Sequence, residues 1–219
     1  HNVYHAIHNF CIVDMSNFYL DVLKDRLYVE GTNSPTRRAA QTAIYRILEA
    51  LTLLISPILA FTSDEIWRSM KHTSSVNADR AVYNDMPKVS GLAVEDGFVE
   101  MWDKIHALRD NVQKALEEAR NAKVIGASLE AKVTLFAKGE TLDFLKACFD
   151  KLADVFIVSA VELKSEGEGS FKGSLEGVSV NVEKAGGHKC ERCWKYTEDI
   201  GADPAHPDIC ARCAGVVSE

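Results

Sequence analysis

The chain has 219 residues, of which 47% are hydrophobic and 26% charged, a composition typical of a globular protein with a core of its own. Its formal net charge of −7 argues against a sequence-independent polyanion binder, but it leaves room for RNA binding through local basic clusters. The longest apolar run, Ile47 to Phe61, is interrupted by polar and proline residues, so it predicts a buried helix and no membrane partner.

The first 120 residues predict four amphipathic helices, because apolar residues recur there at the spacing of one helical face. We expect a long first helix over residues 2–28, with an irregular turn near Met15. Ser34 and Pro35 suit the cap and first turn of a second helix that runs to about residue 55. Residues 62–65 (TSDE) resemble a capping box that opens a short third helix, and a loop over residues 71–91 precedes the fourth. Together these helices predict an antiparallel bundle.

After Gly126 the apolar pattern changes from helical to alternating, which is typical of half-buried strands. We expect strands over residues 131–136, 155–163 and 178–182, and a helix over residues 141–152. Two glycines at 186–187 then separate this part from a cysteine-bearing tail. The predicted fold is therefore mainly α: a helical bundle (residues 1–125), a small α+β connector (126–185) and a C-terminal zinc ribbon with four cysteine ligands (186–219).

Four cysteines form two Cys-x-x-Cys pairs with sixteen residues between them: Cys190 with Cys193, and Cys210 with Cys213. Two intervening residues let a tight turn present both sulfurs of a pair to one metal, and thiolates are the ligands of tetrahedral structural zinc. We therefore expect one structural Zn²⁺ held by all four, with no position left for catalytic water. Chance placement, a redox dithiol and an iron site are the alternatives. Thiol ligation also favours a reducing compartment, hence the cytoplasm.

Several strings in the helical part resemble the anticodon-binding domain shared by isoleucyl-, valyl- and leucyl-tRNA synthetases: NFYLD at 17–21, KDRLY at 24–28, RRAAQT at 37–42 and SPILAFT at 56–62. Two further strings favour the isoleucyl enzyme. IGASLEA at 125–131 resembles its helix-to-strand junction, and HKCERCWKY at 188–196 resembles its C-terminal zinc finger. Along its whole length, the chain is similar to the C-terminal part of a bacterial isoleucyl-tRNA synthetase.

That family joins isoleucine to its tRNA with ATP, through HIGH-like and KMSKS-like signatures that do not occur in this sequence. The resemblance implies a fragment without catalytic or cofactor-binding residues, which binds the anticodon stem-loop of tRNA(Ile) as a monomer beside the remainder of the synthetase. Two alternatives stay open. The first is a fragment of a formamidopyrimidine-type DNA glycosylase, a family that shares the finger but uses an N-terminal proline nucleophile. The second is a structural zinc module that does not contact RNA.

Candidate RNA contacts are cations and one aromatic residue, because phosphates attract Lys and Arg while unstacked bases stack on aromatic faces. Arg37 and Arg38 open a helix, whose N-terminal amides also favour phosphate. The other candidates are Lys24 and Arg26 at a helix end, and Lys189, Arg192, Trp194 and Lys195 around the cysteines. The alternatives are solvated cations, hydrogen bonds from Lys or Arg to the thiolates, and a tryptophan that covers the metal.

Overall fold

The computed structural model describes residues 1–88 and 93–218, and it divides into two compact units, His1–Ala93 (unit 1) and Val94–Glu219 (unit 2). Residues 89–91 of the expected loop lie outside the described residues. Helices predominate, and a small sheet and a four-cysteine module follow them, so the predicted fold class is confirmed. Among the described residues, no helix combines the length and apolar character that a membrane span requires.

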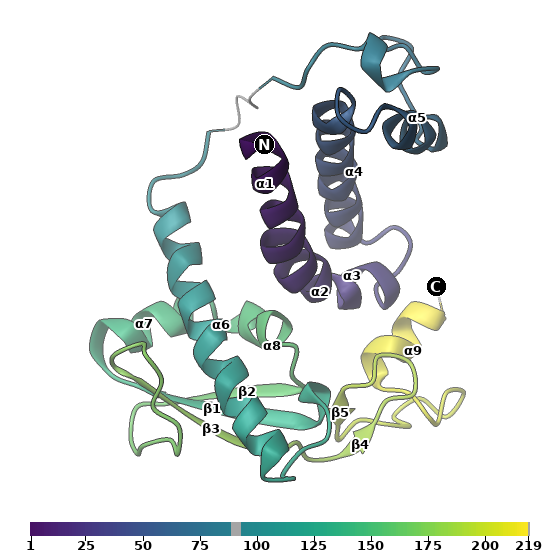
Figure 1. Ribbon diagram of the computed structural model, residues 1–219. Helices are drawn as coiled ribbons and strands as arrows, with labels where there is room; N and C mark the ends of the chain where they lie inside the picture. The colour runs from purple at the N-terminus through teal and green to yellow at the C-terminus, as the bar shows by residue number, and fades with distance from the viewer. Residues whose placement is uncertain (89–92, 219) are drawn as a thin grey trace. The chain divides into compact units, whose positions relative to one another are not determined.

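Unit 1 begins with a nearly continuous helical segment (Figure 1) made of α1 (Asn2–Asn9), a π-helix (Phe10–Tyr19), α2 (Leu20–Val22) and α3 (Lys24–Tyr28). The irregularity expected near Met15 is thus a π-helix of ten residues. The next helix, α4 (Pro35–Ile55), starts as predicted: the hydroxyl of Ser34 accepts a hydrogen bond from the backbone N of Arg37 at 3.4 Å, and proline occupies the first turn.

The core of unit 1 is built around Trp67 of α5 (Ala60–Ser69), whose side chain is fully buried with Leu53 and Ala81. Its indole Nε1 donates to the carbonyl of Asn77 at 2.7 Å, and its ring stacks on His72 with 4.1 Å between the centroids. A short 3-10 helix (Ala81–Tyr83) packs against α5. Apolar burial and one satisfied indole donor therefore hold the expected loop against the helices.

The predicted capping box at residues 62–65 is wrong. Helix α5 begins at Ala60, two residues earlier, and no side chain caps it. Asp64 lies inside the helix, where its buried carboxylate accepts hydrogen bonds from Nη1 of Arg80 at 2.8 Å and from the backbone N of Ala81 at 2.9 Å. The carboxylate of Asp64 thus holds the loop against α5.

Unit 2 contains a three-stranded sheet in the order β2-β1-β3. β1 (Ala131–Ala137) pairs in parallel with β2 (Ala160–Lys164) and antiparallel with β3 (Val178–Lys184). A parallel pair needs a crossover connection, which α7 (Gly139–Ala147) and α8 (Phe149–Phe156) provide. The single helix expected over residues 141–152 is therefore two helices. The strand expected from residue 155 starts only at Ala160, because α8 extends to Phe156 and Ile157 ends it in the left-handed conformation, with φ of 59°.

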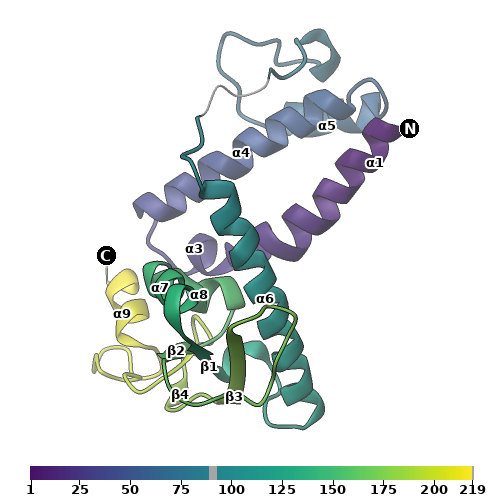
Figure 2. The same ribbon diagram turned by 90° about the vertical axis from the view of Figure 1, so that its left-hand side faces the viewer.

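Helix α6 (Phe98–Asn121) packs against β3 and α8 and crosses the sheet (Figures 1 and 2). Its buried face carries Ile105, Leu108, Val112 and Leu116 at helical spacing, as the sequence predicts. Arg109 is buried on the same helix, and its Nε donates to the backbone carbonyl of Val155 at 3.0 Å. Helix α6, expected as the fourth helix of the bundle, therefore packs with the connector inside unit 2.

The C-terminal module consists of a small hairpin, β4 (His188–Lys189) with β5 (Tyr196–Thr197), and the helix α9 (Ala211–Val217). Gly187 enters the hairpin with φ of 76°, and a Cβ on this residue would lie 2.2 Å from the carbonyl oxygen of Thr197. Only glycine fits there, because both the backbone conformation and the close approach exclude a side chain.

Asp64→Ala should destabilise unit 1 by about 1–3 kcal/mol, because the substitution leaves the buried N–H of Ala81 without an acceptor. Hydrogen exchange of the α5 amides in the full chain measures this loss. Asp79→Ala, which removes an exposed carboxylate from the same loop, is the matched control and should change exchange little. Equal protection in both variants would contradict the assigned role of Asp64.

Candidate metal centre

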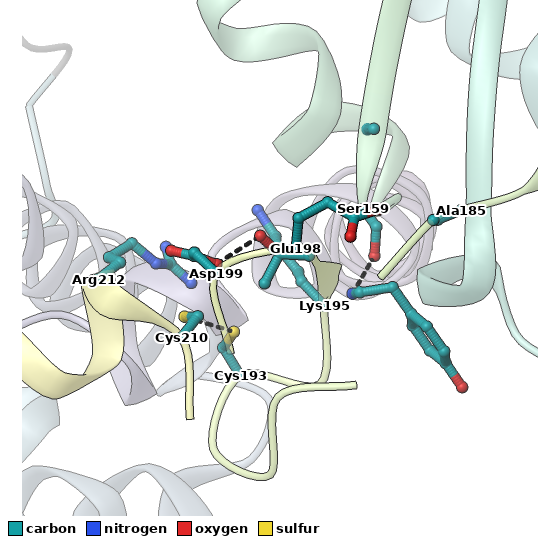
Figure 3. A pocket seen from close by; sticks show the side chains of 12 residues that line it. Ser159, Ala185, Cys193, Lys195, Glu198, Asp199, Cys210 and Arg212 are labelled. Atoms are coloured by element: carbon teal, nitrogen blue, oxygen red, sulfur yellow. Dashed lines mark hydrogen bonds between the residues drawn. The ribbon is translucent and has the colours of Figure 1, made fainter. Parts of the chain in front are cut away.

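The structure brings together the four cysteines that the sequence singles out. Their sulfur atoms all lie within 4.8 Å of one another, and Sγ of Cys193 is 3.9 Å from Sγ of Cys210 (Figure 3). Four sulfurs bound to one tetrahedral zinc at about 2.3 Å would lie about 3.8 Å apart. The donor set and its spacing therefore fit one zinc ion.

The cluster is largely buried. The side chains of Cys190 and Cys213 are 0% exposed, Cys210 is 5% exposed and Cys193 is 9% exposed. In a tetrahedral site of this kind the protein fills every position, so a water molecule cannot be activated there. This arrangement suits a metal that holds the chain in shape.

Backbone hydrogen bonds shape the turn that carries the first cysteine pair. The N–H of Cys190 donates to the carbonyl of Lys195 at 2.9 Å, and the N–H of Trp194 donates to the carbonyl of Cys190 at 2.9 Å. Trp194 takes the left-handed conformation, with φ of 65°, to close this turn. The turn places the two sulfurs of the first pair on the same side of the chain segment that carries them.

The second pair is set by a helix start. Cys210 occupies the N-cap position of α9, and Cys213 lies in the first turn of that helix. The carboxylate of Asp199 accepts hydrogen bonds from the backbone N of Ala211 at 3.1 Å and from the hydroxyl of Thr197 at 2.5 Å. These contacts lower the pKa of Asp199, with the Thr197 hydroxyl as the largest cause. Asp199 thus joins the hairpin to the second cysteine pair.

Burial opposes ionisation of the cysteine thiols to different extents. Burial opposes ionisation of Cys190, but backbone N–H groups of Cys193, Cys210 and Arg192 outweigh it and lower the pKa of Cys190 to about 6. Burial raises the pKa of Cys213 to about 12, helped by the neighbouring sulfurs and opposed by a hydrogen bond from Arg192. Burial likewise raises the pKa of Cys193. The positive charge of a bound metal would offset the cost of ionising Cys193 and Cys213.

Two arginines donate to the sulfurs. Nη1 of Arg192 lies 3.6 Å from Sγ of Cys213, and a hydrogen bond from Arg212 lowers the pKa of Cys193 against the larger effect of burial. Donors of this kind disperse the negative charge of a tetrathiolate site. Of the interpretations proposed for Arg192, the structure shows the hydrogen bond from its side chain to a cysteine sulfur.

The predicted RNA candidates of unit 1 lie at two helix ends. Nζ of Lys24 is paired with Asp21 at 2.7 Å, and Arg26 is half-buried. Arg37 is half-buried, with its Nη1 donating to the backbone carbonyl of Glu30 at 2.9 Å, whereas Arg38 is exposed in the first turn of α4.

The remaining candidates lie on the cysteine module. Trp194 is 59% exposed, and Nζ of Lys189 lies 5.6 Å from the centroid of its ring. Lys195 is paired with Asp154 of the connector at 2.8 Å. Ser159, also in the connector, accepts a hydrogen bond from the backbone N of Tyr196 at 2.7 Å. Sequence reasoning missed Asp154 and Ser159, because no local pattern links them to residues about forty positions away.

Comparison with known proteins gives two family matches. A family described as the anticodon-binding domain of tRNA ligase matches residues 1–135, and a family described as the zinc finger found in FPG and IleRS matches residues 187–215. With the buried four-cysteine cluster, the second match supports one structural zinc ion, as predicted.

Relatives along the whole chain are isoleucine–tRNA ligases. The chain is 49% identical to that of Syntrophotalea carbinolica and 48% identical to that of Carboxydothermus hydrogenoformans, with 100% of the chain covered in both alignments. It spans only 24% and 23% of the length of these two relatives, so it corresponds to about a quarter of each. Because the first family covers more than half of its residues, the chain belongs to the family of anticodon-binding domains of tRNA ligases.

Proposed function

We propose that the chain binds the anticodon stem-loop of tRNA(Ile) as part of an isoleucine–tRNA ligase, whose remaining residues carry the catalytic and editing steps. One observation carries this proposal: a single chain joins the anticodon-binding segment to the zinc finger, and all of it aligns with isoleucine–tRNA ligases. Binding energy at the anticodon would orient the distant acceptor end for reaction. The glycosylase alternative has no counterpart to the match over residues 1–135.

We further propose that Cys190, Cys193, Cys210 and Cys213 are the ligands of the zinc ion. Their burial, their mutual distances and the donors around them support this assignment. When bound, the metal would supply charge neutralisation and a fixed crossing point for two chain segments. The module has few large buried apolar side chains, so metal binding would contribute most of its folding free energy.

On unit 1 we propose Arg38 as the direct phosphate contact. It is exposed in the first turn of α4, where backbone N–H groups and the helix dipole also favour an anion. Arg37 already donates to the carbonyl of Glu30 and would shape that helix start. The pair between Lys24 and Asp21 supports the solvated interpretation for Lys24, and Arg26 stays a weaker candidate.

On the zinc finger we propose that Trp194 stacks on an unpaired base, with Lys189 beside it. A side chain that is 59% exposed despite its apolar ring offers a face for stacking. The finger also carries acidic residues such as Glu191, Asp203 and Asp208, so a general positive field does not explain RNA binding there. Stacking of a base on the indole ring does not require a net positive charge on the finger.

The compartment and the assembly state follow from the same proposal. A tRNA ligase works where translation takes place, so we propose the cytoplasm, in which a tetrathiolate site also stays reduced. We propose that the protein acts as a monomer, because one anticodon-binding segment and one finger would suffice for one tRNA.

Cys213→Ser should abolish stoichiometric zinc binding, since a buried tetrahedral site loses one of four thiolates. Metal analysis should fall from about one zinc per chain to well below it, and amides of residues 188–217 should lose protection from hydrogen exchange. Cys11→Ser, at an exposed cysteine outside the cluster, should retain zinc and protection. Full zinc occupancy in Cys213→Ser would overturn the ligand assignment.

Arg38→Gln should weaken binding of a tRNA(Ile) transcript and lower the slope of log affinity against log salt by about one, because one phosphate contact is lost. Filter binding over a range of salt concentrations measures both quantities. Arg46→Gln is the matched control on the same helix, since that side chain is exposed and pairs with Glu49. Identical slopes in the two variants would remove Arg38 from the interface.

Trp194→Ala separates stacking from shielding of the metal. If the ring stacks on a base, tRNA affinity should fall by about 1–3 kcal/mol while the zinc content stays at one per chain. Parallel titrations with tRNA and with a zinc chelator distinguish the two roles. Unchanged tRNA affinity together with faster zinc loss would instead assign the ring to covering the metal.

A further inference from the structure

The zinc finger is fastened to the connector by two consecutive residues. Nζ of Lys195 lies 2.8 Å from Oδ1 of Asp154 on α8. The backbone N of Tyr196 donates to the hydroxyl of Ser159, a residue labelled in Figure 3, at 2.7 Å. That hydroxyl in turn donates to the carbonyl of Leu129. Two side chains of the connector therefore hold adjacent positions of the hairpin that carries the first cysteine pair.

We propose that Asp154 and Ser159 are positioning residues, which set the orientation of the finger for tRNA, and that Lys195 acts through Asp154 instead of touching a phosphate. This inference rests on the proposed function. It assigns a task to the α+β connector, which otherwise only links the anticodon-binding segment to the finger.

The ion pair is partly shielded from water. The side chain of Lys195 is 20% exposed and that of Asp154 is 31% exposed, whereas Lys24 in its surface pair is 67% exposed. Shielding strengthens attraction between opposite charges and disfavours breaking the pair to bind another anion. Because Lys195 follows Trp194 in the chain, its anchoring also restricts the backbone that aims the exposed indole.

The hydroxyl of Ser159 donates one hydrogen bond and accepts another. A hydroxyl has one hydrogen, and here it points to the carbonyl of Leu129, so the oxygen is left to accept from the N–H of Tyr196. The backbone N of Ser159 also donates to the carbonyl of Ala131 at 3.1 Å, at the start of the central strand β1. Ser159 therefore links the hairpin of the finger to the central strand of the connector.

Rigid placement matters for a stacking contact, because a base gains stacking energy only when the ring meets it at the right distance and angle. A finger that pivots about its linker would still bind zinc, but it would spend only part of its time in the productive orientation. The signature of a positioning residue is therefore weaker tRNA binding with an unchanged metal centre.

A double-mutant cycle in the zinc-loaded 219-residue chain tests the role of the ion pair. Asp154→Asn and Lys195→Met should each weaken binding of a tRNA(Ile) transcript about three- to tenfold, and the double variant should be no weaker than either, because both remove one contact. The salt slope should stay the same in all three. Glu162→Gln, which breaks an ion pair with Lys132 on the sheet, is the control and should bind as the unaltered chain does.

The opposite pattern would overturn the proposal. If Lys195 contacts a phosphate, Lys195→Met should lower the salt slope by about one, and Asp154→Asn should leave affinity unchanged or raise it, since the lysine is then released to the RNA. Additive losses in the double variant would also contradict a shared contact.

Ser159→Ala supplies a readout that needs no RNA. Without the acceptor, the amide of Tyr196 should exchange at least about tenfold faster, while metal analysis still finds one zinc per chain. Ser170→Ala, which removes a hydroxyl bonded to Asn181 elsewhere in the connector, is the control. Faster exchange with unchanged tRNA affinity would overturn the orienting role alone, whereas an unaltered chain that binds no tRNA would overturn the proposed function itself.

Discussion

Mutual repulsion between four closely packed thiolates is the constraint around which the C-terminal module is organised. Turns and a helix start bring the sulfurs within 4.8 Å of one another, and burial makes their charge costly. Hydrogen bonds lower the pKa of Cys190 to about 6, whereas the pKa of Cys213 is raised to about 12. A single divalent cation would stabilise the thiolate of Cys190 and offset the cost of ionising Cys213. Folding of the module and binding of the metal are therefore coupled.

Features that depend on short spacings could be predicted from the sequence. The interval between paired cysteines indicated the cluster, because a tight turn needs only the residues inside it. Ser34 and Pro35 indicated the start of α4, and the apolar face of α6 followed from helical periodicity. In each case the determining partners lie within a few positions of one another along the chain.

Features that depend on distant partners could not be predicted. Asp64 lies within the string that resembles a capping box, but its carboxylate binds Arg80 and Ala81 from a loop sixteen and seventeen residues away. The chain breaks between α7 and α8 and turns at the left-handed Ile157. Both helices contact strands of the sheet, and helical periodicity in the sequence does not encode these contacts. The sequence distinguishes Lys195 only by its charge and its place beside the cysteines, whereas its partner Asp154 lies forty-one residues earlier.

The close approach of Gly187 to Thr197 restricts the backbone at the start of the zinc finger. A diglycine junction is commonly taken as a flexible tether, yet the backbone of one of these glycines lies too close to the carbonyl of Thr197 to admit even a methyl group. The glycine therefore holds the start of the hairpin in one conformation, while Lys195 and Tyr196 of that hairpin bind Asp154 and Ser159 of the connector. An exchange between homologous proteins that carried only residues 186–219 would separate the hairpin from Asp154 and Ser159, so recombination should be tolerated better when the connector is exchanged with it.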